Sequence, residues 1–79
     1  MDRFEIVDAL VGIAKRVLKV EVGPESTSEN TPNWDSLRHV EIVFAAEEAL
    51  DVEFPADSLT KLKSIGALAD AATDYLRAA

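Results

Sequence analysis

Residues 33–50 of this 79-residue chain read NWDSLRHVEIVFAAEEAL, and they contain its clearest helical pattern. Asp35 is a favourable N-cap residue, and the apolar residues after it recur at helical spacing. Asp51 begins the exit from the pattern. We therefore expect a helix over residues 36–50 that begins after Asp35 and ends at Asp51.

This helix carries apolar side chains over a wider arc than a helix in a small bundle can easily bury. One apolar stripe consists of Ile42, Val43, Ala46 and Leu50, with His39 at its edge. A second stripe consists of Leu37, Val40 and Phe44, with Glu41, Glu47 and Glu48 interleaved. If the first stripe faces the core, the second is a partly exposed apolar patch among carboxylates, which suits docking onto a basic groove. The alternative is that Val40 and Phe44 simply belong to the core.

Three further helices are expected from the same periodicity. Their predicted ranges are 3–19 for an amphipathic helix, 57–62 for a short helix begun by Asp57, and 65–77 for a last helix capped by Ser64.

The segment 20–35 has no periodicity and is rich in turn-forming residues, so we expect a long loop that Val22 and Trp34 pin to the helices. The predicted fold class is all-α. It is one domain over residues 1–79, a four-helix bundle with three long helices, one short helix and a long first loop.

Charge and composition narrow the classes of function. The chain has 15 acidic and 8 basic side chains, and residues 20–57 hold ten of the acids with a single base, Arg38. This negative field repels phosphate backbones, so we expect no nucleic-acid partner. With no cysteine and one histidine, we also expect no disulfide and no metal site.

The sequence also bears on the cell compartment. No apolar run approaches the roughly 18 residues of a membrane span. The start, MDRFE, lacks the basic and then apolar pattern of a signal peptide. We therefore expect a cytoplasmic protein without a membrane span, and Met1 suggests a complete short chain.

The junction Asp35-Ser36-Leu37 allows two interpretations. In the first, Asp35 is an ordinary N-cap and Ser36 an ordinary first-turn residue. In the second, Ser36 presents an exposed hydroxyl at a helix N-terminus, where the helix dipole and free amides favour a phosphodiester. Three residues alone do not separate these interpretations.

Taken with the rest of the chain, this junction resembles the acyl carrier protein family. The similar segments are Asn33-Trp34-Asp35-Ser36-Leu37, Val40 to Glu48, Val52-Glu53-Phe54-Pro55, and the ending Ser64-Ile65, Leu68 and Tyr75-Leu76. They cover nearly the whole chain in the expected order. The resemblance implies that Ser36 carries 4′-phosphopantetheine, attached from coenzyme A by a phosphopantetheinyl transferase, with Asp35 and Leu37 flanking the attachment site. The thiol of that arm would hold acyl groups as thioesters, which suits a chain without cysteine.

The resemblance also implies partners. Docking residues at the matching positions are Leu37, Arg38, Val40, Glu41, Phe44, Glu47 and Glu48. The expected partners are the transferase, an acyl-loading ligase or transacylase, and synthase enzymes with basic docking patches. The chain itself would be a monomeric, non-catalytic carrier in fatty-acid, polyketide or related biosynthesis.

Two departures from the family pattern concern the turn and the cargo. Asn33 stands where the family usually has glycine, and asparagine is the other residue that readily adopts positive φ. Trp34 and the pair Arg38-His39 differ from housekeeping fatty-acid carriers, and the motif Asn33-Trp34-Asp35-Ser36-Leu37 is more similar to discrete carriers of polyketide, nonribosomal-peptide or aminoacyl pathways. Acyl and aminoacyl cargo both stay open.

Two other classes of function compete with a carrier. An enzyme would pair Ser36 with His39 as nucleophile and base, but a bundle of this size gives little shelter for an orienting group and an oxyanion site. A small acidic interaction module without a prosthetic group would share the docking patch and need no modification of Ser36.

Overall fold

The computed structural model describes residues 2–78 and contains four helices. They are α1 (Arg3–Leu18), α2 (Ser36–Leu50), α3 (Ser58–Lys61) and α4 (Ile65–Ala78). Within the described residues there is no strand, only an isolated bridge between Thr27 and Ser64. The predicted all-α class, with three long helices, one short helix and a long first loop, is confirmed.

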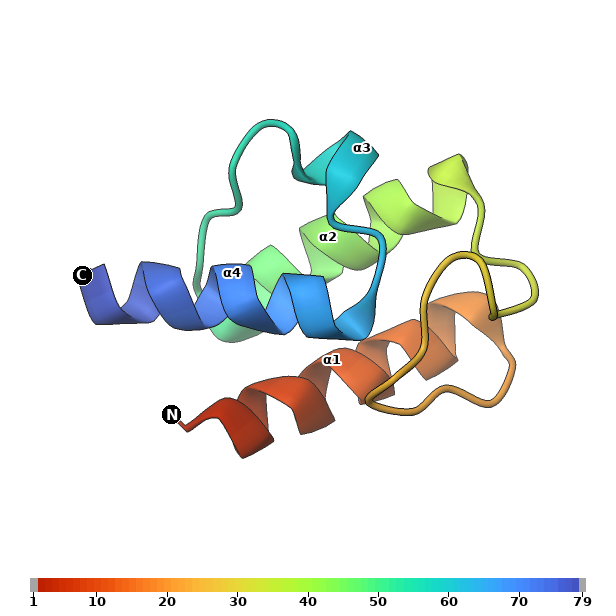
Figure 1. Cartoon of the computed structure of the whole chain (residues 1–79), viewed down its shortest axis with the longest axis horizontal. Helices are drawn as coiled ribbons and strands as arrows, with labels where there is room; N and C mark the ends of the chain where they lie inside the picture. The colour runs from red at the N-terminus through yellow and green to blue at the C-terminus, as the bar shows by residue number, and fades with distance from the viewer. Residues whose placement is uncertain (1, 79) are drawn as a thin grey trace.

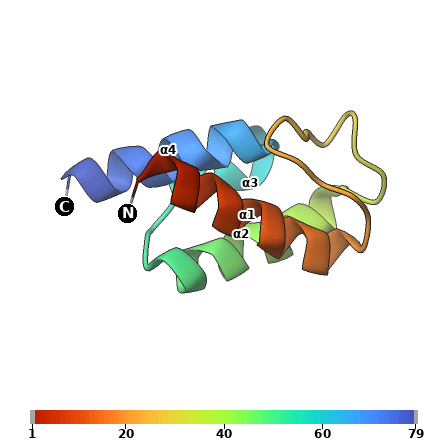
Figure 2. The same cartoon turned by 90° about the horizontal axis from the view of Figure 1, so that it is seen from below.

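The three long helices pack around one core, with α1 in contact with both α2 and α4. Helix α1 contributes one buried face to this core, formed by Ile6, Leu10, Ile13, Ala14 and Leu18. The start of α1 and the end of α4 lie at one end of the molecule, and the loop between α1 and α2 lies at the other end (Figures 1 and 2). The first turn of α2 lies at this loop end, far from both termini.

Helix α1 begins and ends at recognisable caps. The Asp2 carboxylate accepts a hydrogen bond from the Glu5 amide at 2.9 Å, and the Glu5 carboxylate accepts one from the Asp2 amide at 3.1 Å. Lys19 adopts the left-handed conformation, with φ of 59°, so the helix ends at Leu18. The predicted range of 3–19 was therefore one residue too long, because Lys19 is the C-cap.

The long loop 19–35 is fixed to the rest of the fold. Val22 and Trp34 are buried, as the sequence predicted. Two backbone hydrogen bonds also join the loop to residues around the start of α4. The Ser28 amide donates to the main-chain oxygen of Lys63 at 2.9 Å, and the Ile65 amide donates to the main-chain oxygen of Ser26 at 3.0 Å. The loop therefore holds the start of α2 in a defined place.

The short helix differs from its predicted form. Helix α3 spans Ser58–Lys61 rather than 57–62, and Asp57 makes no capping hydrogen bond with its side chain. The Asp57 carboxylate instead lies 3.6 Å from the Lys61 ammonium in an exposed ion pair. The predicted cap of α4 is confirmed, because Ser64 Oγ accepts a hydrogen bond from the Ala67 amide at 3.0 Å.

Candidate functional site

The first turn of α2 is built around Asp35. Its Oδ1 accepts a hydrogen bond from the Arg38 amide at 2.9 Å, and its Oδ2 lies 3.0 Å from the Arg38 guanidinium. The hydrogen bond from the Arg38 amide, with the guanidinium charge in support, holds the pKa of Asp35 below its usual value. Asp35 is thus the N-cap that the sequence predicted.

The turn before the cap depends on Asn33. Its φ is 70°, in the left-handed region that asparagine tolerates better than most residues. Its side-chain amide donates to the main-chain oxygen of Leu18 at 3.0 Å. Asn33, at the position where the resemblance leads us to expect glycine, therefore adopts a positive φ and makes a contact with the end of α1.

Ser36 is the first residue of α2, and its side chain is exposed. The first amides of a helix have no intrahelical acceptor. In α2, the first amide that donates to a main-chain oxygen of the helix is that of His39, which bonds to the main-chain oxygen of Asp35 at 2.9 Å. An accessible hydroxyl therefore stands beside open amide groups at the positive end of a helix dipole. This arrangement favours an anionic substituent such as a phosphodiester on Ser36.

His39 lies deeper than the sequence indicated. We expected it at the edge of the core, yet its exposed fraction is 0%. Its Nδ1 accepts a hydrogen bond from Trp34 Nε1 at 3.1 Å, and its Nε2 lies 2.9 Å from the main-chain oxygen of Ser58. Because both ring nitrogens have partners, His39 is not free to act as a base for Ser36, which removes the arrangement that an enzyme would need.

The second apolar stripe of α2 lies at the surface. Leu37 and Phe44 are exposed over 68% and 57% of their area, and Val40 is half-buried. Glu41 and Glu48 are exposed beside them. The alternative that Val40 and Phe44 are core residues is therefore wrong for Phe44.

Two side chains expected at the same face are used differently. The Glu47 carboxylate accepts a hydrogen bond from the Phe54 amide at 2.8 Å and so supports the exit from α2. Arg38 pairs with Asp35 and lines a hollow with Arg16 and Lys19, at the end of α1. The sequence did not show the Glu47 contact, which uses a backbone group, or the hollow, which joins Arg38 to residues of another segment.

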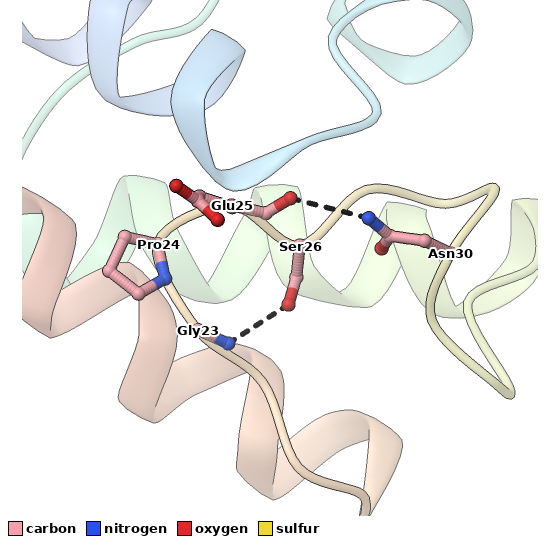
Figure 3. Close-up of a pocket in the computed structure, with 5 residues that line it drawn as sticks. All are labelled: Gly23, Pro24, Glu25, Ser26 and Asn30. Carbon is pink, nitrogen blue, oxygen red and sulfur yellow. Dashed lines mark hydrogen bonds between the residues drawn. The ribbon is translucent and has the colours of Figure 1, made fainter.

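The long loop contains a shallow pocket lined by Gly23, Pro24, Glu25, Ser26 and Asn30 (Figure 3). Ser26 Oγ accepts a hydrogen bond from the Gly23 amide at 2.9 Å, and the Asn30 side-chain amide donates to the main-chain oxygen of Glu25 at 3.4 Å. These polar groups therefore maintain the loop conformation. Among residues 2–78 there is no group of three potential metal ligands, and no helix in that range is long and apolar enough to cross a membrane.

Comparisons with known proteins agree with this architecture. No protein-family model matches the chain. It is 33% identical over 79 residues to "Acyl carrier protein 2, mitochondrial" of Arabidopsis thaliana, a match covering 96% of this chain and 60% of that protein. It is 42% identical over 65 residues to "Acyl carrier protein" of Helicobacter hepaticus, covering 82% of this chain and 86% of that protein.

The fold is that of a small helical protein, and the second relative is matched over most of its length. The chain belongs to the acyl carrier protein family. Proteins of this family are non-catalytic carriers, and membership implies a phosphopantetheine prosthetic group. The resemblance drawn from the sequence is confirmed at this level.

Proposed function

We propose that this protein carries acyl groups as thioesters on a 4′-phosphopantetheine arm attached to Ser36. The observation that carries the proposal is the exposed Ser36 hydroxyl at the capped N-terminus of α2, in a chain of the acyl carrier protein family. When bound, the arm supplies the thiol that this cysteine-free chain lacks.

The residues around Ser36 fit a phosphodiester. The amides at the start of α2 and the helix dipole favour negative charge at the hydroxyl. The Asp35 carboxylate is already engaged by the Arg38 amide and guanidinium, which reduces its repulsion of a nearby phosphate. Asn33 and Asp35 hold the backbone on the N-terminal side of Ser36, so the hydroxyl is presented from a fixed turn.

The transfer reaction requires a separate enzyme and coenzyme A. The Ser36 oxygen forms a bond to the phosphorus next to pantetheine, and the bond from that phosphorus to the bridging pyrophosphate oxygen breaks. Adenosine 3′,5′-bisphosphate leaves, and the serine proton passes to a base of the transferase. His39 takes no part, because both its ring nitrogens are occupied inside the fold.

Partner enzymes would dock on the surface formed by the second stripe of α2. We define this docking face as Leu37, Val40, Glu41, Phe44 and Glu48. The exposed apolar side chains supply contact area, and the carboxylates attract enzymes with basic patches. Arg38 and Glu47 border this face and are tied into the fold by the contacts described above.

The partners we propose are a phosphopantetheinyl transferase, an acyl-loading ligase or transacylase, and synthase enzymes of fatty-acid, polyketide or related pathways. An aminoacyl or peptidyl cargo is the alternative, because the motif Asn33-Trp34-Asp35-Ser36-Leu37 resembles that of specialised carriers. Because a tethered thioester has a high effective concentration at each enzyme, weak docking is sufficient.

The proposal is tested by intact mass. Wild-type protein incubated with coenzyme A and a broad-specificity transferase should gain the mass of one phosphopantetheine group, and Ser36→Ala should gain none while keeping its helical circular dichroism. A wild-type chain that gains no mass would identify an acidic interaction module instead.

A further inference from the structure

A continuous line of buried hydrogen bonds runs from the long loop through α2 to α3. Trp34 Nε1 donates to His39 Nδ1 at 3.1 Å, and the two rings are stacked with centroids 6.0 Å apart. His39 Nε2 then lies 2.9 Å from the main-chain oxygen of Ser58, the first residue of α3. Trp34 is 5% exposed and His39 0% exposed, so water does not compete for these bonds.

These contacts allow only one protonation state of His39. The indole N–H of Trp34 is a donor only, so Nδ1 must act as the acceptor. The ring proton must then be on Nε2, where it donates to the Ser58 oxygen. A doubly protonated ring would direct an N–H at the Trp34 N–H, which loses one bond and buries an unpaired donor.

The residues of this hydrogen-bond line lie on both sides of the proposed attachment site in the sequence. Trp34 lies two residues before Ser36, and His39 lies three residues after it. The Trp34–His39 hydrogen bond therefore connects the residues before and after Ser36 inside the core, and the bond from the Arg38 amide to Asp35 connects them at the surface. The Ser36 hydroxyl is exposed, but the backbone that carries it is held from both sides.

The same line of hydrogen bonds holds α3, which has few other polar contacts with the rest of the fold. The Asp57 side chain makes no capping bond, and the ion pair between Asp57 and Lys61 is exposed. Ser58 Oγ is buried and has no hydrogen-bond partner within the described residues. The bond from His39 to the Ser58 main-chain oxygen is thus the buried polar link between α2 and α3.

We propose that Trp34 and His39 are positioning residues for the modification of Ser36, which they hold in register with α3 through the Ser58 carbonyl. This proposal rests on the proposed function and names two further residues on which it depends. Breaking the line lets the first turn of α2 rotate relative to the loop and α3, and the hydroxyl then meets the phosphorus of coenzyme A less often in reactive geometry.

Four variants separate positioning from simple stability. His39→Phe fills the space but leaves the Trp34 N–H without its acceptor, and the Ser58 main-chain oxygen keeps only the Leu62 amide, at 3.3 Å. His39→Gln keeps one donor and one acceptor. Trp34→Phe removes the donor of the first bond and trims a buried aromatic ring. Ile6→Val is the control, because it trims a buried side chain in the first half of α1 and removes no polar group.

The measurement is the initial rate of mass gain with coenzyme A and transferase, at several concentrations of carrier and under conditions where each variant is folded. We expect His39→Phe and Trp34→Phe to lower kcat by about ten- to a hundredfold with a smaller change in KM. His39→Gln should keep most of the wild-type rate, and Ile6→Val should match wild type. The double variant Trp34→Phe/His39→Phe should be no slower than His39→Phe, because both changes break the same line of bonds.

A spectroscopic measurement checks the line itself. The chain has one tryptophan and one histidine, so each ring gives a single set of nitrogen resonances. The histidine shifts should report a proton on Nε2, and the Trp34 Nε1 proton should exchange slowly in wild type and quickly in His39→Phe.

The possible failures are distinct. If wild type gains no mass, the proposed function itself is wrong. If wild type is modified and folded His39→Phe is modified at the same kcat, or Ile6→Val loses as much rate, Trp34 and His39 are structural residues and this inference is overturned. A proton on Nδ1 in place of Nε2 would also overturn it.

Discussion

The side-chain amide of Asn33 donates a hydrogen bond to the main-chain oxygen of Leu18, with an Nδ2···O distance of 3.0 Å. Leu18 is the last residue of α1, and Asn33 lies three residues before Ser36. The bond therefore ties the turn before the proposed attachment site to a carbonyl that the helix end leaves without an intrahelical partner. A glycine at this position could supply the positive φ but not the contact.

This relationship predicts an order of stability among Asn33 variants. Asn33→Ala loses the bond and places a less tolerant residue at φ of 70°. Its free energy of unfolding should fall by roughly 1–3 kcal/mol, from left-handed strain and one hydrogen bond. Asn33→Gly loses the bond without that strain, so its loss should be smaller. Urea unfolding at neutral pH measures both, and an alanine variant as stable as wild type would contradict the role given to Asn33.

The buried histidine predicts a pH dependence of stability. Burial lowers the pKa of His39 below its usual 6.5, and the positive charge of Lys63 acts in the same direction, while the bond to the Ser58 oxygen opposes them. Because the unfolded chain binds the proton more tightly, the stability that neutral His39 provides is present above pH 6.5 and is lost as the pH falls through the folded-state pKa.

Wild type should therefore lose free energy of unfolding as the pH falls below 6.5. His39→Gln should show a smaller loss over the same range, because glutamine does not titrate. Denaturant unfolding at a series of pH values provides the test. Equal slopes for wild type and His39→Gln would show that His39 does not titrate below its usual range.

The helices were predictable because the contacts that begin them join residues close together in the sequence. The Asp35 and Ser64 caps each bond to an amide three residues later, so residue type and spacing were sufficient. The exposed second stripe of α2 was also predictable, since one helix in a small bundle buries only one face.

The parts that could not be predicted depend on contacts between separate segments. His39 is held by Trp34 in the loop and by a main-chain oxygen in α3. Because every residue has a main-chain oxygen, the sequence does not indicate which one acts as the acceptor. The same reason explains Glu47, whose partner is the Phe54 amide. The residue type of Asp57 favours capping, but its carboxylate pairs with Lys61 instead.

The two adjacent glutamates of α2 should behave differently. Glu47→Ala removes the acceptor for the Phe54 amide and should lower the free energy of unfolding by about 1 kcal/mol. Glu48→Ala changes an exposed side chain and should stay within about 0.5 kcal/mol of wild type. Urea unfolding of the two variants side by side measures the difference, and equal losses would mean that the Glu47 contact contributes nothing.

The docking face predicts a salt-dependent effect of charge. Glu41→Lys or Glu48→Lys should weaken association with a transferase that has a basic patch, by about tenfold or more at low salt and less at high salt. Asp74→Lys makes the same change in net charge on α4 and is the matched control. Binding is measured by fluorescence anisotropy at two salt concentrations. Equal weakening by all three variants would show an effect of net charge alone.

The apolar part of the same face has its own prediction. Leu37→Ala and Phe44→Ala remove side chains that are mostly exposed, so both variants should unfold at the wild-type urea concentration. Their association with the transferase should weaken at low and at high salt, because apolar contact is not screened. Wild-type affinity in both variants would contradict the assignment of this face.

The most direct test of the account is the site of attachment. Trypsin cleavage after Lys19 and Arg38 releases a peptide over residues 20–38, which contains Ser26, Ser28 and Ser36. After incubation with coenzyme A and transferase, fragmentation of this peptide should place one phosphopantetheine group on Ser36. An unmodified peptide, or a group on Ser26 or Ser28, would contradict the claim that the first residue of α2 is the anchor.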